Sequence, residues 1–164
     1  MTKTAPVAIR PATAADVPTL LRLIRELAAF ENALDQVVAT EATLLAEGFG
    51  PRPAFEALLA EVEGAAVGFA LFFHNFSTWQ GRRGLYIEDL YVTPAARGLK
   101  VGERLVRACA ALALARGCPR LDLQVLDWNP ARGFYRRLGL EHQAAWLSYR
   151  ATGPALSALA EPLP

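Results

Sequence analysis

The segment from Leu85 to Gly102 constrains the fold more than any other part of the chain. Its first eight residues, L-Y-I-E-D-L-Y-V, favour a β-strand over 85–92, and Thr93-Pro94 ends that strand. Apolar residues then recur at helical spacing from Val101 to Arg116. Backbone N–H groups at a helix N-terminus are unpaired and attract anions, and the loop before this helix carries Arg97 and Lys100. The segment therefore predicts a strand, a phosphate-holding loop and a helix, although a bare connection with surface charges has the same spacing.

The rest of the chain predicts short strands and amphipathic helices in a mixed order. Thr13 with Asp16, and later Thr40, have the pattern of helix N-caps, and Gly48 is expected to end the second helix in a left-handed conformation. Glu63-Gly64 is a hairpin signal. We expect a mixed sheet with helices packed on it. The expected strands are 7–10, 55–61, 67–76, 85–92, 121–126 and a weak strand 146–150, and the helices are 14–30, 40–48, 101–116 and 130–138.

Length and composition fit one ordinary domain over 1–164, with a possibly flexible tail at 151–164. The chain has 164 residues, of which 53% are hydrophobic, and its formal charge of +1 gives no global case for nucleic acid or an anionic membrane. Residues 1–9 lack the apolar core of a signal peptide, so a cytoplasmic location is expected. Cys109 and Cys118 are too few for a disulfide framework, and no tight Cys/His cluster predicts a metal site.

The segment EDLYVTPAARGLKVGERLV resembles the acetyl-CoA motif of the GNAT superfamily of N-acetyltransferases. Together with IRPATAADVPTLLRLIRELAAFE, TEATLLAEGFG, AEVEGAAVGFALFF and DWNPARGFYRRLG, it resembles the diamine (spermidine/spermine) acetyltransferases, a family that includes thialysine acetyltransferases. The resemblance spans roughly residues 9–149. It implies a GNAT-like α/β fold, in which helices flank a mostly antiparallel sheet that is splayed at the cofactor strand. It also implies acetyl-CoA as co-substrate and a homodimer.

The resemblance assigns the cofactor to three places in the chain. The loop and helix start would hold the pyrophosphate through Arg97, Gly98, Leu99, Lys100, Val101, Gly102 and Glu103. A bulge or splay in the strand would free backbone groups of Leu90, Tyr91 and Val92 for the pantetheine arm. Asn129, Arg132 and Tyr135 match further cofactor contacts. The loop departs from the family at Lys100, where glycine is usual; this lysine could crowd the pyrophosphate or pair with a phosphate.

Two residues match the family's proton-transfer groups. Glu88 matches the proposed general base, because an alkylammonium with a pKa of about 10.4 must lose a proton before it attacks a thioester. Tyr135 matches the general acid that protonates the leaving CoA thiolate. The residues alone leave alternatives open: Glu88 and Asp89 could lie on opposite faces of one strand, and Tyr135 could be a core aromatic. No residue stands out as a covalent nucleophile, so direct attack in a ternary complex is expected.

The resemblance places the amine against Phe30, Glu31, Trp79, Glu88 and Asp89. Aromatic faces and carboxylates both attract alkylammonium groups. Ser77, however, stands where polyamine enzymes tend to have aspartate, and residues 140–145 lack an acidic pair found there. A diamine, a polyamine and a lysine analogue all remain candidate substrates. A protein N-terminus or an aminoglycoside as acceptor, and a non-catalytic CoA-binding module, are the alternatives.

Overall fold

A computed structural model describes residues 6–162, and the chain divides into two compact units, Met1–Gln124 and Val125–Pro164. Each unit is described by itself below. The expectations for the N-terminus and for the tail extend in part to residues 1–5 and 163–164, which lie outside the described residues. Within residues 6–162, no helix is both long enough and apolar enough to span a membrane.

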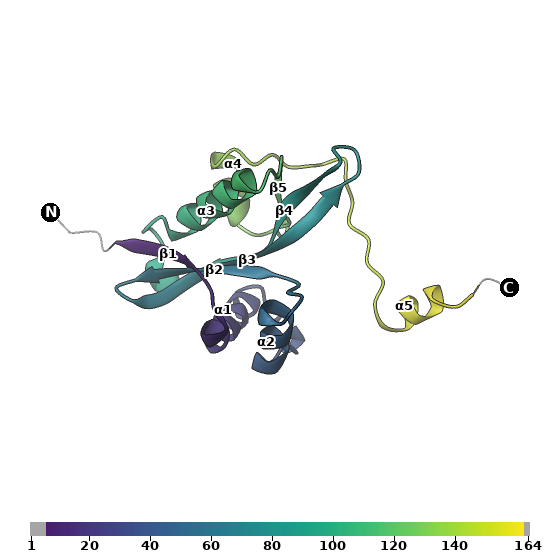
Figure 1. Ribbon diagram of the computed structural model, residues 1–164, viewed down its shortest axis with the longest axis horizontal. Coiled ribbons are helices and arrows are strands. Elements are labelled where there is room, and N and C mark those ends of the chain that lie inside the picture. Colours follow the sequence, from purple (N-terminus) through teal and green to yellow (C-terminus); the bar gives the residue numbers. More distant parts are fainter. Residues whose placement is uncertain (1–5, 163–164) are drawn as a thin grey trace. The chain divides into compact units, whose positions relative to one another are not determined.

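The first unit is built on a five-stranded sheet with the strand order β1-β2-β3-β4-β5 (Figure 1). The strands are β1 (Val7–Pro11), β2 (Glu56–Val62), β3 (Ala65–Ser77), β4 (Arg82–Val92) and β5 (Leu121–Leu123). All neighbouring pairs are antiparallel except β4 and β5, which run parallel. The predicted mixed, mostly antiparallel sheet is therefore confirmed.

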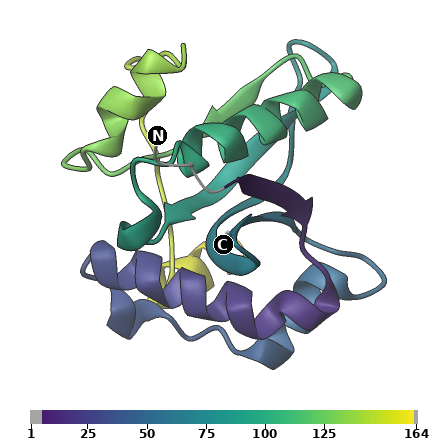
Figure 2. The same cartoon turned by 90° about the vertical axis from the view of Figure 1, so that its left-hand side faces the viewer.

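Helices cover both faces of this sheet, as Figures 1 and 2 show. Helices α1 (Val17–Phe30) and α2 (Glu41–Phe49) lie on one face, and α3 (Val101–Ala115) lies on the other. Short 3₁₀ turns at 14–16 and 94–96 lie between a strand and the helix that follows it, and a third at 34–36 lies between α1 and α2. On the α1 face, Leu20 and Leu23 are fully buried against Leu59 and Phe69 of the sheet. The first unit therefore has three layers: α1 with α2, the sheet, and α3.

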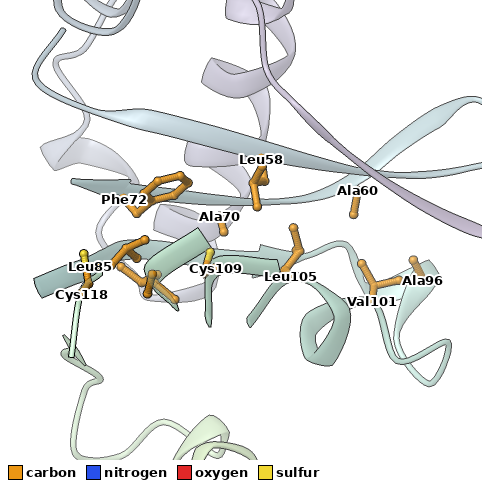
Figure 3. Packing of buried hydrophobic residues seen from close by; sticks show 12 residues of the cluster. Leu58, Ala60, Ala70, Phe72, Leu85, Ala96, Val101, Leu105, Cys109 and Cys118 are labelled. Carbon is orange, nitrogen blue, oxygen red and sulfur yellow. The ribbon is translucent and has the colours of Figure 1, made fainter. Parts of the chain in front are cut away.

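The larger core cluster lies between the sheet and α3 (Figure 3). Leu105 and Cys109 of α3 meet Leu58, Ala70 and Phe72 from β2 and β3, and each of these side chains is at least 95% buried. Burying a leucine or phenylalanine side chain is worth roughly 1.5–3 kcal/mol. This packing fixes the start of α3 against β4, and with it the loop that the sequence marks as the anion site.

Several local signals in the sequence are confirmed. Glu63 and Gly64 have φ values of +52° and +80°, as a two-residue hairpin turn of type I′ requires. Thr40 caps α2, because its Oγ1 accepts a hydrogen bond from Thr43 N at 3.2 Å. The expectation for Gly48 is wrong: it lies inside α2 without a positive φ, and a Cβ there would fall 2.4 Å from the Phe55 ring. Close packing, not chain reversal, requires that glycine.

The second unit contains α4 (Ala131–Arg137) and α5 (Gly153–Leu159). Helix α4 and its closing Gly139, with φ +89°, agree with the prediction. Two expectations are corrected. The segment 146–150 forms no strand in the described chain, and the tail after Thr152 contains a helix. In the first unit, β5 ends at Leu123 and not at Leu126.

Candidate active site

The loop between β4 and α3 presents a row of backbone donors. Gly98 adopts φ +88° and Lys100 adopts φ +59°, ψ 23°, whereas Leu99 between them is not left-handed. Such an alternation makes a concave nest of N–H groups that binds anions. The first hydrogen bond of α3 runs from Arg104 N to Lys100 O at 3.0 Å, so the N–H groups of residues 101–103 have no acceptor within the helix. The loop thus has the geometry of a site for a phosphate group.

Lys100 is strained in this loop. A left-handed conformation costs a residue with a Cβ roughly 1–2 kcal/mol, whereas glycine adopts it freely. The structure therefore gives a physical reason for the glycine that the resemblance leads one to expect here. The lysine side chain is exposed, and the loop keeps the left-handed conformation with a Cβ at this position.

Replacing Lys100 with glycine should stabilise the protein by about 1 kcal/mol relative to Lys100→Ala. Both variants lose the charge, but only alanine keeps a Cβ in the left-handed conformation. Denaturant unfolding measures the difference, and equal stabilities would show that the position is not strained. Calorimetric titration with CoA gives the second result: we expect both variants to bind within about tenfold of the unaltered chain, because backbone donors at a helix start supply most of the anion binding.

Glu88 is the extra residue of a β-bulge in β4. Leu71 pairs with Asp89, but the next residue of β3, Phe72, pairs with Ile87, so Glu88 has no partner in the ladder. Residues two apart normally share a face, yet Ile87 packs on the α3 side while Asp89 pairs with Leu71 of the α1 side. Bulges re-aim side chains in this way. The bulge was expected at this strand, but its position at Glu88 itself was not.

The pairing of β4 with β5 ends before the bulge. Among the described residues, β5 pairs with Leu85–Ile87 of β4 and with no later residue of that strand. Thr93 N donates to Val67 O at 2.8 Å, which places Thr93 and Tyr91 in hydrogen-bonded pairs with β3. By the alternation of the ladder, the backbone groups of Leu90 and Val92 point to the opposite edge. Of the three residues proposed to meet the pantetheine arm, these two have the suitable backbone direction, whereas Tyr91 directs its backbone toward β3.

Carboxylates gather on the α1 face beside the bulge. The pKa of Asp89 is raised to about 6, mainly by burial and to a smaller extent by the charges of Glu88 and Glu31. Burial also raises the pKa of Glu31, which follows the last residue of α1. Burial and then the charges of Glu88 and Asp122 raise the pKa of Tyr86. The structure thus brings together the carboxylates of Glu31, Glu88 and Asp89, in an environment that favours a cationic partner.

The aromatic residue at the end of α1 links this cluster to the anion loop. The guanidinium carbon of Arg97 lies 5.3 Å from the centre of the Phe30 ring. A cation over an aromatic face at this distance is attracted by roughly 0.5–1 kcal/mol at an exposed site. Phe30 therefore contacts Arg97 of the proposed cofactor loop. The two residues are 67 positions apart, and the sequence did not predict this contact.

Trp79 does not join the cluster within the first unit. It lies in the turn between β3 and β4, and Ser77 pairs with Arg82 at the base of that turn. Glu88 lies six positions after Arg82 along β4, a length of roughly 20 Å at the usual rise of a strand. Ser77, which replaces the aspartate of polyamine enzymes, is buried, and its Oγ accepts a hydrogen bond from Gln80 N at 3.3 Å. Ser77 thus supports its own turn.

The remaining predicted residues lie in the second unit, around the start of α4. Asn129 is buried, and its Oδ1 accepts a hydrogen bond from Ala131 N at 2.9 Å. Arg132 donates from Nη1 to Asp127 O at 2.7 Å. Tyr135 is half-buried, with its ring centre 5.2 Å from that of Phe134. Both polar side chains hold the turn before α4, which orients the helix that carries Tyr135.

Comparison with known proteins decides the family. The model of the acetyltransferase (GNAT) family matches residues 22–140. The chain belongs to the GNAT acetyltransferase family. It is an enzyme that uses acetyl-CoA, as this family does, and the resemblance seen in the sequence is confirmed. Among described residues, no group of three or more His, Cys, Asp or Glu side chains could hold a metal ion.

Two relatives and one solved structure show how closely this acetyltransferase matches known proteins. Thialysine N-epsilon-acetyltransferase of Bos taurus is 41% identical over 94% of this chain and 97% of its own length. Spermidine/spermine N(1)-acetyltransferase-like protein 1 of Homo sapiens is 39% identical over 87% of this chain but 22% of its own length. An integron cassette protein from the mobile metagenome of V. cholerae superposes with a TM-score of 0.80, at 25% identity, over 95% of this chain and 98% of its own.

Proposed function

We propose that this acetyltransferase transfers the acetyl group to a terminal primary amine of a small molecule, with a lysine analogue such as thialysine as the first candidate. The observation that carries the proposal is the cluster of Glu31, Glu88 and Asp89 beside the anion loop. Carboxylates in a partly buried setting bind an ammonium group well. The names of the two relatives, a thialysine and a spermidine/spermine acetyltransferase-like protein, support an amine of this kind.

In the proposed reaction the amine attacks the thioester directly. The N-terminus of α3 and Arg97 to Lys100 bind the pyrophosphate, and the outward backbone groups of Leu90 and Val92 pair with the pantetheine arm. Glu88 accepts one proton of the ammonium, the amine nitrogen bonds to the carbonyl carbon, and the C–S bond breaks as the nitrogen gives its second proton to water. Tyr135 protonates the departing CoA thiolate and regains a proton from water. The product is an N-acetyl amide and free CoA.

Neither cysteine of the chain fits a covalent acetyl-enzyme. Cys109 and Cys118 are both buried, and burial raises the pKa of the Cys109 thiol to about 12. A thiol is nucleophilic only as thiolate, so Cys109 is inert at neutral pH. This supports a ternary complex over a two-step mechanism. Parallel lines in a two-substrate initial-rate experiment would contradict it, because they indicate ping-pong kinetics.

The pKa of Asp89 gives the proposal a pH dependence. Below pH 6 Asp89 is protonated, so the KM for the amine should fall as pH rises through about 6. In Asp89→Asn this step should disappear. The native state holds the Asp89 proton more tightly than the unfolded chain does, so stability declines between the ordinary pKa near 3.8 and about 6. The free energy of unfolding of Asp89→Asn should therefore be roughly 1–2 kcal/mol higher than that of the unaltered protein at pH 7.

Initial rates of the unaltered protein and of Asp89→Asn between pH 5 and 8 test the predicted change in KM. Thermal melts of both proteins in the same buffers test the predicted change in stability. The charges of Glu88 and Glu31 also act on Asp89, so the difference between the two profiles, not either profile alone, reports Asp89. An identical step near pH 6 in both proteins would assign the titration to another group.

The acceptor is tested by following thiol release from acetyl-CoA with thialysine, lysine, putrescine, spermidine, a peptide and an aminoglycoside. We expect thialysine or a short diamine to give the highest kcat/KM, because Ser77 is not acidic and residues 140–145 contain one carboxylate, Glu141, and not an acidic pair that would suit a longer polyamine. Preference for the peptide or the aminoglycoside would identify the alternative acceptor class. CoA binding without thiol release from any amine would identify a non-catalytic module.

The proposal includes a homodimer in the cytoplasm. In the second unit, Trp146, Leu147 and Tyr149 are all at least 70% exposed, as is Leu159 of α5. Large apolar side chains gathered on one segment favour contact with another protein surface, and a second copy is the simplest partner. Sedimentation at micromolar concentration tests this part, and a monomer would contradict it.

A further inference from the structure

A polar cluster ties three strands together at the point where β4 and β5 are still paired. Asn75 of β3 donates from Nδ2 to Asp122 Oδ2 of β5 at 3.1 Å. Arg120 Nε lies 2.9 Å from the same oxygen, although it makes no hydrogen bond there, so this contact is ionic. Arg120 O also accepts from Leu85 N at 3.1 Å. None of these side chains belongs to the residues assigned to the cofactor, the amine or proton transfer.

Gly84 makes the cluster possible. Strand β4 lies between β3 and β5, so a side chain of β3 reaches one of β5 only where β4 carries none. Asn75 pairs with Gly84, and a Cβ on Gly84 would fall 2.5 Å from Asn75 Oδ1 and 3.0 Å from Arg120 Nε. That Cβ would displace both groups. The glycine is therefore required by the contact across the strand and not by its backbone conformation.

The cluster lies at β5, just before the pairing of β4 with β5 ends. Strand β5 is three residues long, and a parallel pair this short is weakly held by its backbone bonds. Leu121 and Leu123 pack toward α3, which fixes one face of β5. Asp122 fixes the other face through Asn75. The pairing of Ile87 with Leu123 is the last before the Glu88 bulge, so the end of β5 marks where the outward edge of β4 is no longer paired with β5.

We infer that Asn75 and Asp122 are positioning residues, which hold β5 in its pairing with Leu85–Ile87 and thereby fix where the outward edge of β4 becomes free to receive the pantetheine arm. This inference rests on the proposed binding of that arm at Leu90 and Val92. The Asn75–Asp122 contact does not touch the cofactor. It acts through the backbone of β5, which pairs with β4 at Leu85–Ile87, just before the free outward edge.

The test is a charge swap between the two residues. Asn75→Asp places two carboxylates opposite each other, whereas the double variant Asn75→Asp/Asp122→Asn restores a hydrogen bond with its polarity reversed. We expect Asn75→Asp to raise the KM for acetyl-CoA about five- to tenfold and the double variant to return it to within about twofold of the unaltered enzyme, as for a directly coupled pair. The KM for the amine should stay within about twofold in both.

Two further variants keep the test decisive. Asn75→Ala removes the hydrogen bond without adding charge, and it serves if Asn75→Asp does not fold; a KM for acetyl-CoA raised about threefold is expected. Glu61→Gln is the matched control. Glu61 of β2 forms an ion pair with Arg10 of β1, so it also links two strands, but at the other side of the sheet. It should lower the melting temperature without changing either KM.

A purely structural role would lower the melting temperature and the active fraction, and hence the apparent kcat, but not the KM for acetyl-CoA. An unchanged KM in folded Asn75→Asp or Asn75→Ala would therefore overturn the inference, as would a double variant no better than Asn75→Asp. In both cases the unaltered enzyme still binds CoA, so the proposed function stands. If the unaltered enzyme shows no CoA affinity by calorimetry, the proposed cofactor site fails, and the inference fails with it.

Discussion

Replacing Tyr135 with phenylalanine is expected to lower kcat by about 100-fold or more, with the fold intact. The half-buried ring packs beside Phe134, and phenylalanine keeps that ring, so only the hydroxyl is lost. A phenol with a pKa of about 10 is a suitable donor to a thiolate whose conjugate thiol has a pKa of about 8.5. The loss should fall on kcat with little change in either KM, because protonation of the leaving group occurs only in the transition state. Steady-state rates at saturating acetyl-CoA and amine measure it.

The same substitution at Tyr149 is the matched control for Tyr135. Tyr149 belongs to the same unit of the chain and is 92% exposed, so Tyr149→Phe removes a hydroxyl without removing a candidate acid. Its kcat should equal that of the unaltered enzyme. If Tyr135→Phe also turns over at a near-normal rate, Tyr135 is a packing aromatic of α4, and another group or water protonates the thiolate.

Local patterns predicted most of the first unit because their causes are local. The strand-forming residues of Leu85–Val92 and the positive φ values that Glu63 and Gly64 adopt act within a few neighbouring residues. The anion loop was predicted for the same reason, since a helix start exposes donors whatever surrounds it. Lys100 was recognised as atypical, but its left-handed backbone, the physical reason for the usual glycine, needed the structure.

The features that escaped prediction depend on pairing between distant segments. The bulge at Glu88 exists because β3 changes register against β4 between Leu71 and Phe72, and neither strand alone shows where that change falls. Gly84 lies just before the expected strand 85–92 and received no role from the sequence, although it permits the contact of Asn75 with Asp122. The expected strand 146–150 has strand-like residues but no pairing partner in the described chain, and a strand is defined by its partner.

The bulge makes Glu88→Gln the most informative change to the chemistry. We expect kcat/KM at pH 7 to fall by about 100-fold, because no base then removes the proton of the ammonium. The variant must use amine that is already deprotonated, which at a pKa of about 10.4 is roughly one molecule in 2,500 at pH 7. Its kcat/KM should therefore gain about tenfold for each unit of pH up to about 9, a slope that the unaltered enzyme lacks over the same range. Initial rates from pH 6.5 to 9.5 test this.

Asp89→Asn separates loss of a base from loss of a charge. It removes a carboxylate next to Glu88 whose charge acts on the same site, so it should raise the KM for the amine but leave the pH profile above 7 parallel to that of the unaltered enzyme. If Glu88→Gln behaves in this second way, Glu88 only attracts the amine, and the base lies elsewhere. If it shows the steep profile, the bulge has a chemical purpose. It takes one carboxylate out of the ladder of β4, where no strand partner fixes its direction, and leaves it able to reach the nitrogen that Asp89 and Glu31 hold.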